Sequence, residues 1–233
     1  MRRPTIGESR YPEANDFMVL LRDWRQDAII RMLGFVWSGY DLLARDVLAG
    51  LNPEHSYEDL ERSITQYLEP RIRESMTGFE PYYMQHGAYE HETRRAAPAQ
   101  PPQYDLAFVW YRNERVMFPL EAKVLRTSGD VAAYLADVRE QFLTCRYAPF
   151  SSEAAMLAYL LSGAPDKTFE AVSQKLSCAV ELHPNFNTRS HRFSDHRRDV
   201  PQGEMYPTNL RIHHLVLEIM LEEERKKKGG AAL

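Results

Sequence analysis

Residues 104–125 read Tyr-Asp-Leu-Ala-Phe-Val-Trp-Tyr-Arg-Asn-Glu-Arg-Val-Met-Phe-Pro-Leu-Glu-Ala-Lys-Val-Leu. Two apolar runs, 104–111 and 116–125, are rich in β-branched and aromatic residues, and a polar link at 112–115 separates them. Runs of this kind joined by a short polar link are typical of a β-hairpin. We therefore expect one α/β domain that contains this hairpin.

Glu121 and Lys123 are expected on one face of the second strand, because residues two apart in a strand point to the same side. Asp105 shares that face only if it lies opposite Glu121 or Lys123, so that the numbers of paired residues add up to 226 or 228. A loop of three or five residues, or a bulge, meets this condition. A four-residue loop at 112–115 would instead place Asp105 opposite Ala122.

Two carboxylates on one face repel each other unless a cation lies between them. Hard divalent cations such as Mg²⁺ bind oxygen ligands and retain several waters, so Asp105, Glu121 and the carbonyl of Ala122 would form a partial ligand shell. Such an ion polarises a phosphoryl oxygen and lowers the pKa of a bound water, and Lys123 would orient that water or offset developing charge. The pattern favours metal-assisted hydrolysis of phosphodiester bonds. The alternative is an ordinary surface hairpin, whose cross-strand charge pairs are worth at most about 1 kcal/mol.

The same residues resemble the PD-(D/E)xK nuclease superfamily, in which an Asp opens one strand and a Glu-x-Lys follows on the next. Asp105, Glu121 and Lys123 match that pattern, whereas Tyr104 stands where the motif has Pro. The resemblance covers about residues 55 to 220 and implies a restriction-endonuclease-like α/β core, with a mixed central sheet flanked by helices. It also implies that Asp105 and Glu121 bind Mg²⁺ or Mn²⁺ and that Glu61, on an upstream helix, completes the metal site.

A downstream block, 139–159, resembles uncharacterised members of this superfamily that are encoded with bacterial defence genes. The resemblance implies nucleic acid as the substrate, DNA rather than RNA, and a role in defence against phage or mobile DNA. Arg139 and Gln141 lie off the apolar stripe of the expected helix and would reach a phosphate or the attacking water; solvation on the helix surface is the alternative. Gln141 and Tyr147 are six residues apart, so the Gln-x-x-x-Tyr signature of the recombination nucleases is not met.

The formal net charge of −4 argues against a broadly basic surface for nucleic acid. Basic residues are nevertheless concentrated between 189 and 198, in what we interpret as a loop. Arg189, Arg192, Arg197 and Arg198 would hold phosphates there, supplying salt-sensitive affinity without sequence preference. A solvated loop is an equally weighted alternative.

Helical periodicity dominates the first part of the chain. Apolar residues recur every three to four positions between 11 and 49, and Gly34 is a candidate break between two helices. Ser56 is expected to cap the next helix, which carries Glu61 at the edge of its apolar stripe. Glu61 would either lean toward the sheet or pair with its helix neighbours Arg62 or Thr65 in water. Pro70 is expected to kink or end that helix.

Alternating helices and strands are expected after the hairpin. Helices are expected at 128–142 and 165–176, and strands at 178–182 and 210–219. Ala, Met and Leu in 155–161 favour a helix by propensity, but the resemblance requires a strand there, and we follow the resemblance. His213 and His214 would point in opposite directions in the last strand, so they would not form a chelating pair.

We divide the chain into a helical N-terminal extension (1–54), a nuclease-like domain (55–221) and a charged C-terminal tail (222–233). With 44% hydrophobic and 27% charged residues, no apparent secretory signal and no membrane-length apolar run, the chain is typical of a soluble cytoplasmic protein without membrane contact. Its two cysteines suit a reducing compartment.

The expected partners are nucleic acid and either a second copy of the chain or a defence-system protein. Two alternatives to a nuclease stay open. One is a non-catalytic member of the same fold that acts as a binding subunit. The other is an unrelated helix-rich interaction protein in which Asp105 and Glu121 lie on opposite faces or far apart.

Overall fold

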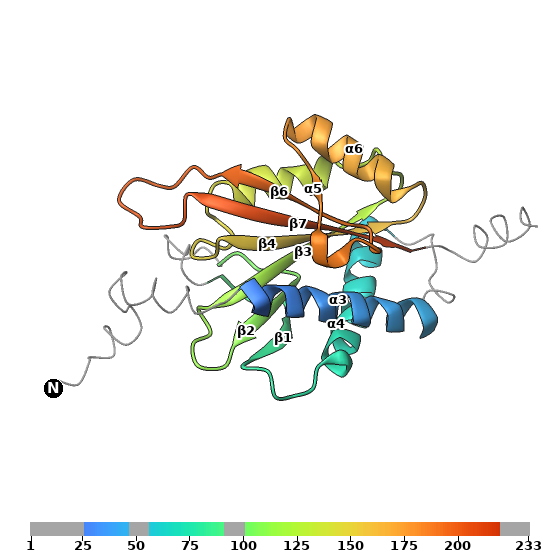
Figure 1. Cartoon of the computed structure of the whole chain (residues 1–233), viewed down its shortest axis with the longest axis horizontal. Coiled ribbons are helices and arrows are strands. Elements are labelled where there is room, and N and C mark those ends of the chain that lie inside the picture. Colours follow the sequence, from blue (N-terminus) through green and yellow to red (C-terminus); the bar gives the residue numbers. More distant parts are fainter. Residues whose placement is uncertain (1–25, 47–55, 91–100, 220–233) are drawn as a thin grey trace, which may run out of the picture.

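The structure, a computed structural model, describes residues 26–46, 56–90 and 101–219 of the chain. Helices flank a mixed seven-stranded sheet (Figure 1), so the expectation of an α/β fold is confirmed at this level. In chain order the elements are helices α3 (Gln26–Asp46) and α4 (Tyr57–Ser75), strands β1 (Tyr82–His86), β2 (Leu106–Trp110) and β3 (Met117–Leu125), helix α5 (Ala132–Asp137) continued by the π-helix η2 (Val138–Phe142), strand β4 (Glu153–Leu160), helix α6 (Pro165–Leu176), strand β5 (Glu181–Leu182), the 3₁₀-helix η3 (Pro184–Phe186), and strands β6 (His191–Arg197) and β7 (Asn209–Glu218).

The strands follow the order β1-β2-β3-β4-β7-β6-β5. The central strands β3, β4 and β7 are parallel, and the remaining pairs are antiparallel. Every residue of β4 after Glu153 is buried, as a central parallel strand covered on both faces requires. Burial on both faces therefore overrides the helical propensity of this segment, and the strand expected at 155–161 is confirmed, beginning two residues earlier.

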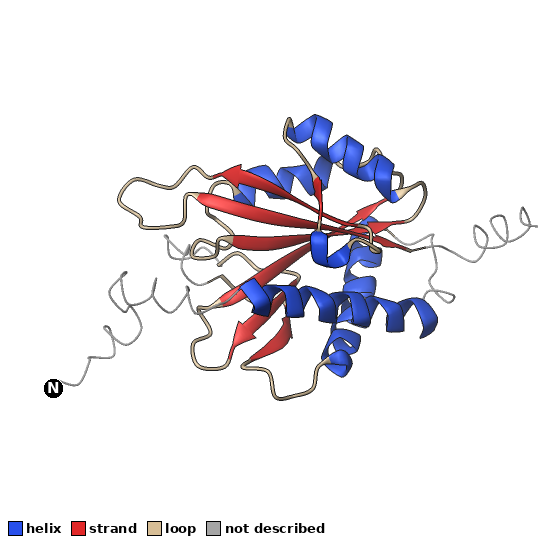
Figure 2. Cartoon of the chain, in the orientation of Figure 1, coloured by secondary structure: helices blue, strands red, loops and turns tan. Residues whose placement is uncertain are grey.

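Two apolar cores lie on the two faces of the sheet. Figure 2 shows the helices on both sides of the strands. Helices α3 and α4 cover one face and helices α5 and α6 the other. Side chains alternate between these cores along each central strand: Leu215 and Leu217 face α3 and α4, whereas Ile212 and Val216 face α5 and α6. The same alternation directs neighbouring histidines of β7 to opposite faces, as expected.

Helix α3 runs without interruption from Gln26 to Asp46, so the expected break at Gly34 is wrong. A glycine costs a helix about 1 kcal/mol relative to alanine. The buried side of α3, which includes Leu33 and Val36, packs in the same core as α4 and the sheet and offsets that cost. The earlier part of the expected helical region, up to residue 25, lies outside the described residues.

Gly39 lies at a close approach of α3 to α4. A methyl group added there would lie 2.6 Å from Cγ1 of Ile72 and 2.7 Å from its backbone nitrogen, whereas one added at Gly34 would meet nothing within 4 Å. We expect Gly39→Ala to lower the free energy of unfolding by about 1–3 kcal/mol, because the helices must move apart. Gly34→Ala is the control in the same helix and should raise it by up to about 1 kcal/mol. Equal urea midpoints for the two variants would contradict this close approach.

Several helix boundaries follow the local signals. The backbone N–H of Asp59 donates to Oγ of Ser56, as expected of an N-cap. Pro70 does not end α4, which continues to Ser75. The helix expected at 128–142 is present as α5 and η2, and α6 spans 165–176 as expected. Only Glu181–Leu182 of the strand expected at 178–182 pairs with a neighbour.

Within the described residues, no helix combines the length and the apolar character needed to cross a membrane. The charged tail at 222–233 lies outside the described residues.

Candidate active site

The hairpin has the register that brings Asp105 and Glu121 together. Leu106 pairs with Leu120, so the numbers of paired residues add up to 226. The N–H of Trp110 donates to the carbonyl of Val116, in the same register, so five residues, 111–115, form the loop, one of the lengths that the sequence required. Asp105, immediately before β2, is therefore opposite Glu121, which does not fit the arrangement expected of a helix-rich interaction protein, with the two acids on opposite faces or far apart.

Strands β2 and β3 separate where these acids lie. Beyond its last pair with β2, strand β3 pairs only with β4 and leaves backbone amides on its open edge. The N–H of Ala122 donates to Oδ2 of Asp105 at 2.8 Å, and the N–H of Val124 donates to Oε2 of Glu61 at 3.2 Å. Glu61 thus reaches from α4 to the edge of the sheet. The open edge holds both acids in position, since each replaces a missing strand partner.

Lys123 lies at the centre of the acidic cluster. Its Nζ is 3.2 Å from Oε1 of Glu61, 3.3 Å from Oε1 of Glu121 and 3.1 Å from Oδ2 of Asp137. Asp137, the last residue of α5, was not singled out from the sequence. The one signal that could have found it is its position four residues before Gln141, since residues four apart share a helix face.

Burial dominates the protonation of this cluster. It raises the pKa of Asp105 and that of Glu61. Burial, followed by the charges of Asp105 and Asp137, raises the pKa of Glu121 well above its usual value. Burial alone would lower the pKa of Lys123, but the carboxylates around it raise that pKa above its usual value. The cluster therefore combines a persistent positive charge with acids that bind protons readily.

The donor atoms of the cluster suit a hard divalent cation. Four carboxylates and one ammonium leave a formal charge of −3 when all are ionised. Oε2 of Glu121 is buried without a hydrogen-bond partner, which is costly unless a ligand uses it. Mg²⁺ and Mn²⁺ prefer such oxygen ligands, so Asp105, Glu121 and Glu61 are the residues that would hold the ion.

Two further polar side chains border the cluster. Gln141 lies one turn beyond Asp137 in η2, and its buried Oε1 has no hydrogen-bond partner. Burial, and after it the charges of Glu121 and Asp137, raises the pKa of Tyr147. The side chain of Tyr147 is therefore near these two acids. A contact between Gln141 and the substrate stays a prediction.

The basic segment expected as a loop is largely strand β6, because its residues pair with β7. Arg192 forms an ion pair with Asp166 of α6 at 3.0 Å and lies over the ring of Phe169. Arg189 binds both carboxylate oxygens of Asp41. Arg189 and Arg192, which were expected to hold phosphates, therefore connect helices α3 and α6 to the edge of the sheet. Arg197 is exposed.

Arg139 and Arg198 are also used inside the fold. The guanidinium of Arg139 donates to the carbonyl of Lys175 at the end of α6. Arg198 is only 4% exposed and donates to the carbonyls of Ala148, Pro149 and Pro207. Three of the five N–H groups of Arg198 therefore serve backbone carbonyls, an arrangement that favours a structural role over the expected contact with phosphate.

Arg198→Met is expected to lower the free energy of unfolding by about 2–4 kcal/mol, because it leaves these carbonyls without donors. The exposed neighbour provides the control: Arg197→Met should change stability by no more than about 0.5 kcal/mol. Urea unfolding measures both. A stable Arg198→Met protein with weakened affinity for nucleic acid would restore the phosphate role.

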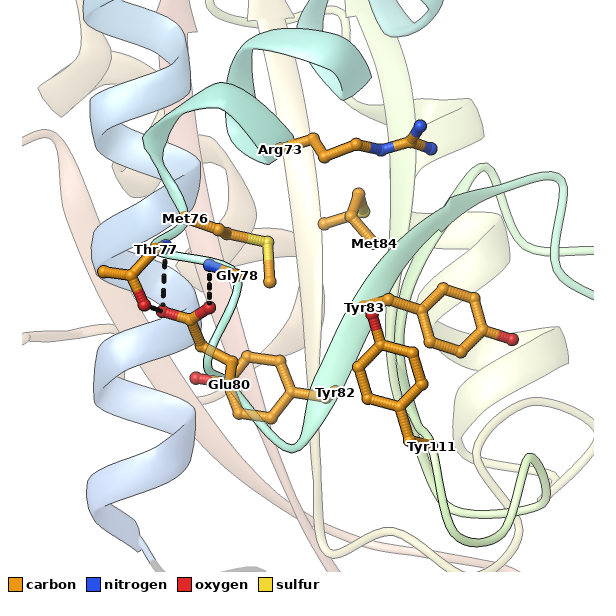
Figure 3. A pocket seen from close by; sticks show the side chains of 9 residues that line it. All are labelled: Arg73, Met76, Thr77, Gly78, Glu80, Tyr82, Tyr83, Met84 and Tyr111. Atoms are coloured by element: carbon orange, nitrogen blue, oxygen red, sulfur yellow. Dashed lines mark hydrogen bonds between the residues drawn. The ribbon is translucent and has the colours of Figure 1, made fainter.

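A cavity of about 490 Å³ opens at the other end of the hairpin, beside β1 (Figure 3). Tyr83 and Tyr111 lie together there, with ring centroids 5.0 Å apart. The carboxylate of Glu80 accepts hydrogen bonds from the turn at Thr77 and Gly78, so it stabilises that turn. No residue of the acidic cluster lines this cavity, and it is not part of the candidate site.

Comparisons with protein-family models, curated proteins and solved structures found no match to this chain.

Proposed function

We propose that this protein is a metal-dependent nuclease with a restriction-endonuclease-like fold that hydrolyses phosphodiester bonds in nucleic acid. The observation that carries the proposal is the convergence of Asp105, Glu121, Lys123 and Glu61 at the open edge of β3. An ordinary surface hairpin would leave these side chains in water. Here Glu121 is only 6% exposed, and its orphaned oxygen is costly to the fold unless a ligand binds it.

Each residue has a distinct role in this proposal. Asp105, Glu121 and Glu61 would hold Mg²⁺ or Mn²⁺, which when bound polarises a phosphoryl oxygen and lowers the pKa of a bound water. Lys123 keeps its proton and would orient the attacking water or offset charge that develops on the phosphate. Asp137 holds the ammonium of Lys123 in place and is a positioning residue.

The substrate class and biological setting rest on the resemblance described above. We propose DNA as the substrate and defence against phage or mobile DNA as the role, with a second copy or a defence-system protein as partner. The rival assignment is a non-catalytic binding subunit of the same fold. It shares the geometry but requires no divalent cation, so metal dependence separates the two.

The direct test is cleavage of plasmid DNA, single-stranded DNA and RNA by the full chain with Mg²⁺, Mn²⁺ or EDTA. We expect cleavage that needs the metal, is lost in Asp105→Asn and is retained in Asp130→Asn, an exposed acid outside the cluster. Equal cleavage by wild type and Asp105→Asn would remove the proposal. Absence of cleavage of all three substrates by folded wild type in Mg²⁺ and in Mn²⁺ would favour the binding subunit.

A further inference from the structure

Three histidines meet on the face of the sheet opposite the acidic cluster. His183 directly precedes η3, His191 opens β6 and His213 lies in β7; their exposed fractions are 5%, 0% and 1%. One nitrogen of each ring lies within 4.8 Å of the others. Glu121 of β3 pairs with Met156 of β4, and His213 of β7 pairs with Ala155 of β4. Met156 and Ala155 are adjacent and face different cores, so Glu121 and His213 lie on opposite faces of the sheet.

The ring positions suit a tetrahedral metal. Nε2 of His191 is 3.3 Å from Nδ1 of His213. Two nitrogens that each lie about 2.0–2.1 Å from one tetrahedral zinc are about 3.4 Å apart. The other nitrogen of His213, Nε2, is 2.8 Å from Oε2 of Glu153. A carboxylate behind a histidine is the usual means of fixing a metal-binding imidazole.

We propose that His183, His191 and His213 bind one Zn²⁺ ion, with water as the fourth ligand and Glu153 orienting His213. Imidazole nitrogens favour zinc and related transition metals over Mg²⁺, so the two faces of the sheet select different ions. Burial lowers the pKa of His183 to about 4 and lowers that of His191 further, so these two rings are neutral at neutral pH and can bind a metal.

The metal-free arrangement predicts what must move when zinc binds. Nε1 of Trp37 donates to Nδ1 of His191, and the backbone N–H of Asn185 donates to Nδ1 of His183, each at 3.2 Å. A neutral imidazole that binds zinc through one ring nitrogen carries its proton on the other ring nitrogen. Both donors must therefore turn away, whereas the bond from His213 to Glu153 is kept. Trp37 becomes a reporter of zinc binding.

A cavity borders the site from the side of Glu153, and a bound ion would have a structural role. This cavity, of about 560 Å³, is lined by Glu153 and Arg211, among others, and by none of the three histidines. His183 and His191 flank η3, so a shared ion would tie the 183–191 segment to β7. A structural zinc adds its binding free energy to the stability of such a segment.

The test uses metal-stripped full chain titrated with Zn²⁺ and, separately, with Mg²⁺. Bound metal, thermal midpoint and tryptophan fluorescence are measured. We expect one Zn²⁺ at this site, at least tenfold weaker binding in His183→Gln and about 10–100-fold weaker binding in Glu153→Gln. Mg²⁺ should not displace it. The fluorescence change should disappear in Trp37→Phe while zinc is still bound.

Two controls isolate the site. His196→Gln alters a histidine of the same strand whose ring bonds to Ser194, and it should bind zinc as wild type does. Asp105→Asn removes an acidic ligand on the other face and reveals any zinc held there. Folding is checked by near-ultraviolet circular dichroism, and Glu153→Gln carries the test if His183→Gln does not fold. No zinc on folded wild type, or undiminished binding in the folded variants, would overturn the proposal.

Discussion

Lys123→Met is expected to abolish cleavage and to destabilise the metal-free protein at the same time. The ammonium contacts Glu61, Glu121 and Asp137, so its removal leaves these acids without the cation that joins them. Loss of one partner from buried ion pairs costs about 3–5 kcal/mol, less where the acids take up protons. Loss of an electrostatic or proton-transfer group in the transition state lowers the rate by about 10²–10⁴-fold.

Lys123→Arg separates these two effects. It keeps the positive charge, so stability should be close to wild type, but a planar guanidinium does not reproduce the position of the ammonium and cleavage should still fall. Lys167→Met removes an exposed lysine from α6 and should change neither quantity. Urea unfolding in EDTA and single-turnover cleavage in Mg²⁺ measure the effects. Wild-type rates in Lys123→Met would remove this residue from the mechanism.

The hairpin was predictable from the sequence, but its register was left open and depended on the length of the loop. Strand alternation placed Glu121 and Lys123 on one face. For Asp105 to share that face, the residue numbers of each cross-strand pair had to add up to 226 or 228, and the structure has 226. Strand β4 was predictable only through the resemblance, because its Ala and Leu content favours a helix locally. Its burial between two parallel neighbours comes from the topology of the sheet.

What could not be predicted depends on partners that are remote in sequence. Asp137 joins the site because α5 packs against β3, and its position four residues before Gln141 is the one signal in the sequence that marks it. Arg198 is an ordinary basic residue in the sequence, and its three carbonyl partners lie 9 to 50 residues away. The histidine cluster could not be predicted, because it forms only when β6 and β7 lie side by side in the sheet. A single strand shows only that His213 and His214 diverge.

Glu121→Gln is expected to abolish metal-dependent cleavage and, in contrast to Lys123→Met, to stabilise the metal-free protein. Its side chain is 8% exposed and faces the charges of Asp105 and Asp137. The amide removes one of four negative charges and adds two N–H donors beside oxygen atoms, while Lys123 keeps its other acidic partners. We expect about 1–3 kcal/mol of added stability at pH 8 in EDTA.

The direction of the pH dependence follows from the raised pKa of Glu121. A carboxyl group whose pKa is higher in the folded state stabilises the fold below its unfolded pKa, and that stability is lost as the pH rises toward the folded value. Wild type should therefore lose stability as the pH rises above about 4.3, the usual pKa of a glutamate. Glu121→Gln should show less of this loss, so the difference between the proteins grows with pH. Glu140→Gln, an exposed acid on η2, should behave as wild type.

Addition of Mg²⁺ should reverse the order of stability of the two proteins. The ion binds ionised carboxylates, so its affinity for wild type rises over the same pH range in which the metal-free fold weakens. At a concentration 100 times the dissociation constant it stabilises the fold by about 2.7 kcal/mol. Glu121→Gln lacks a ligand and should gain little. Thermal midpoints at pH 5 and pH 8, with EDTA or Mg²⁺, test this. Greater stability of wild type than of Glu121→Gln in EDTA at pH 8 would mean that Lys123 already compensates this carboxylate, which removes the reason for a metal there.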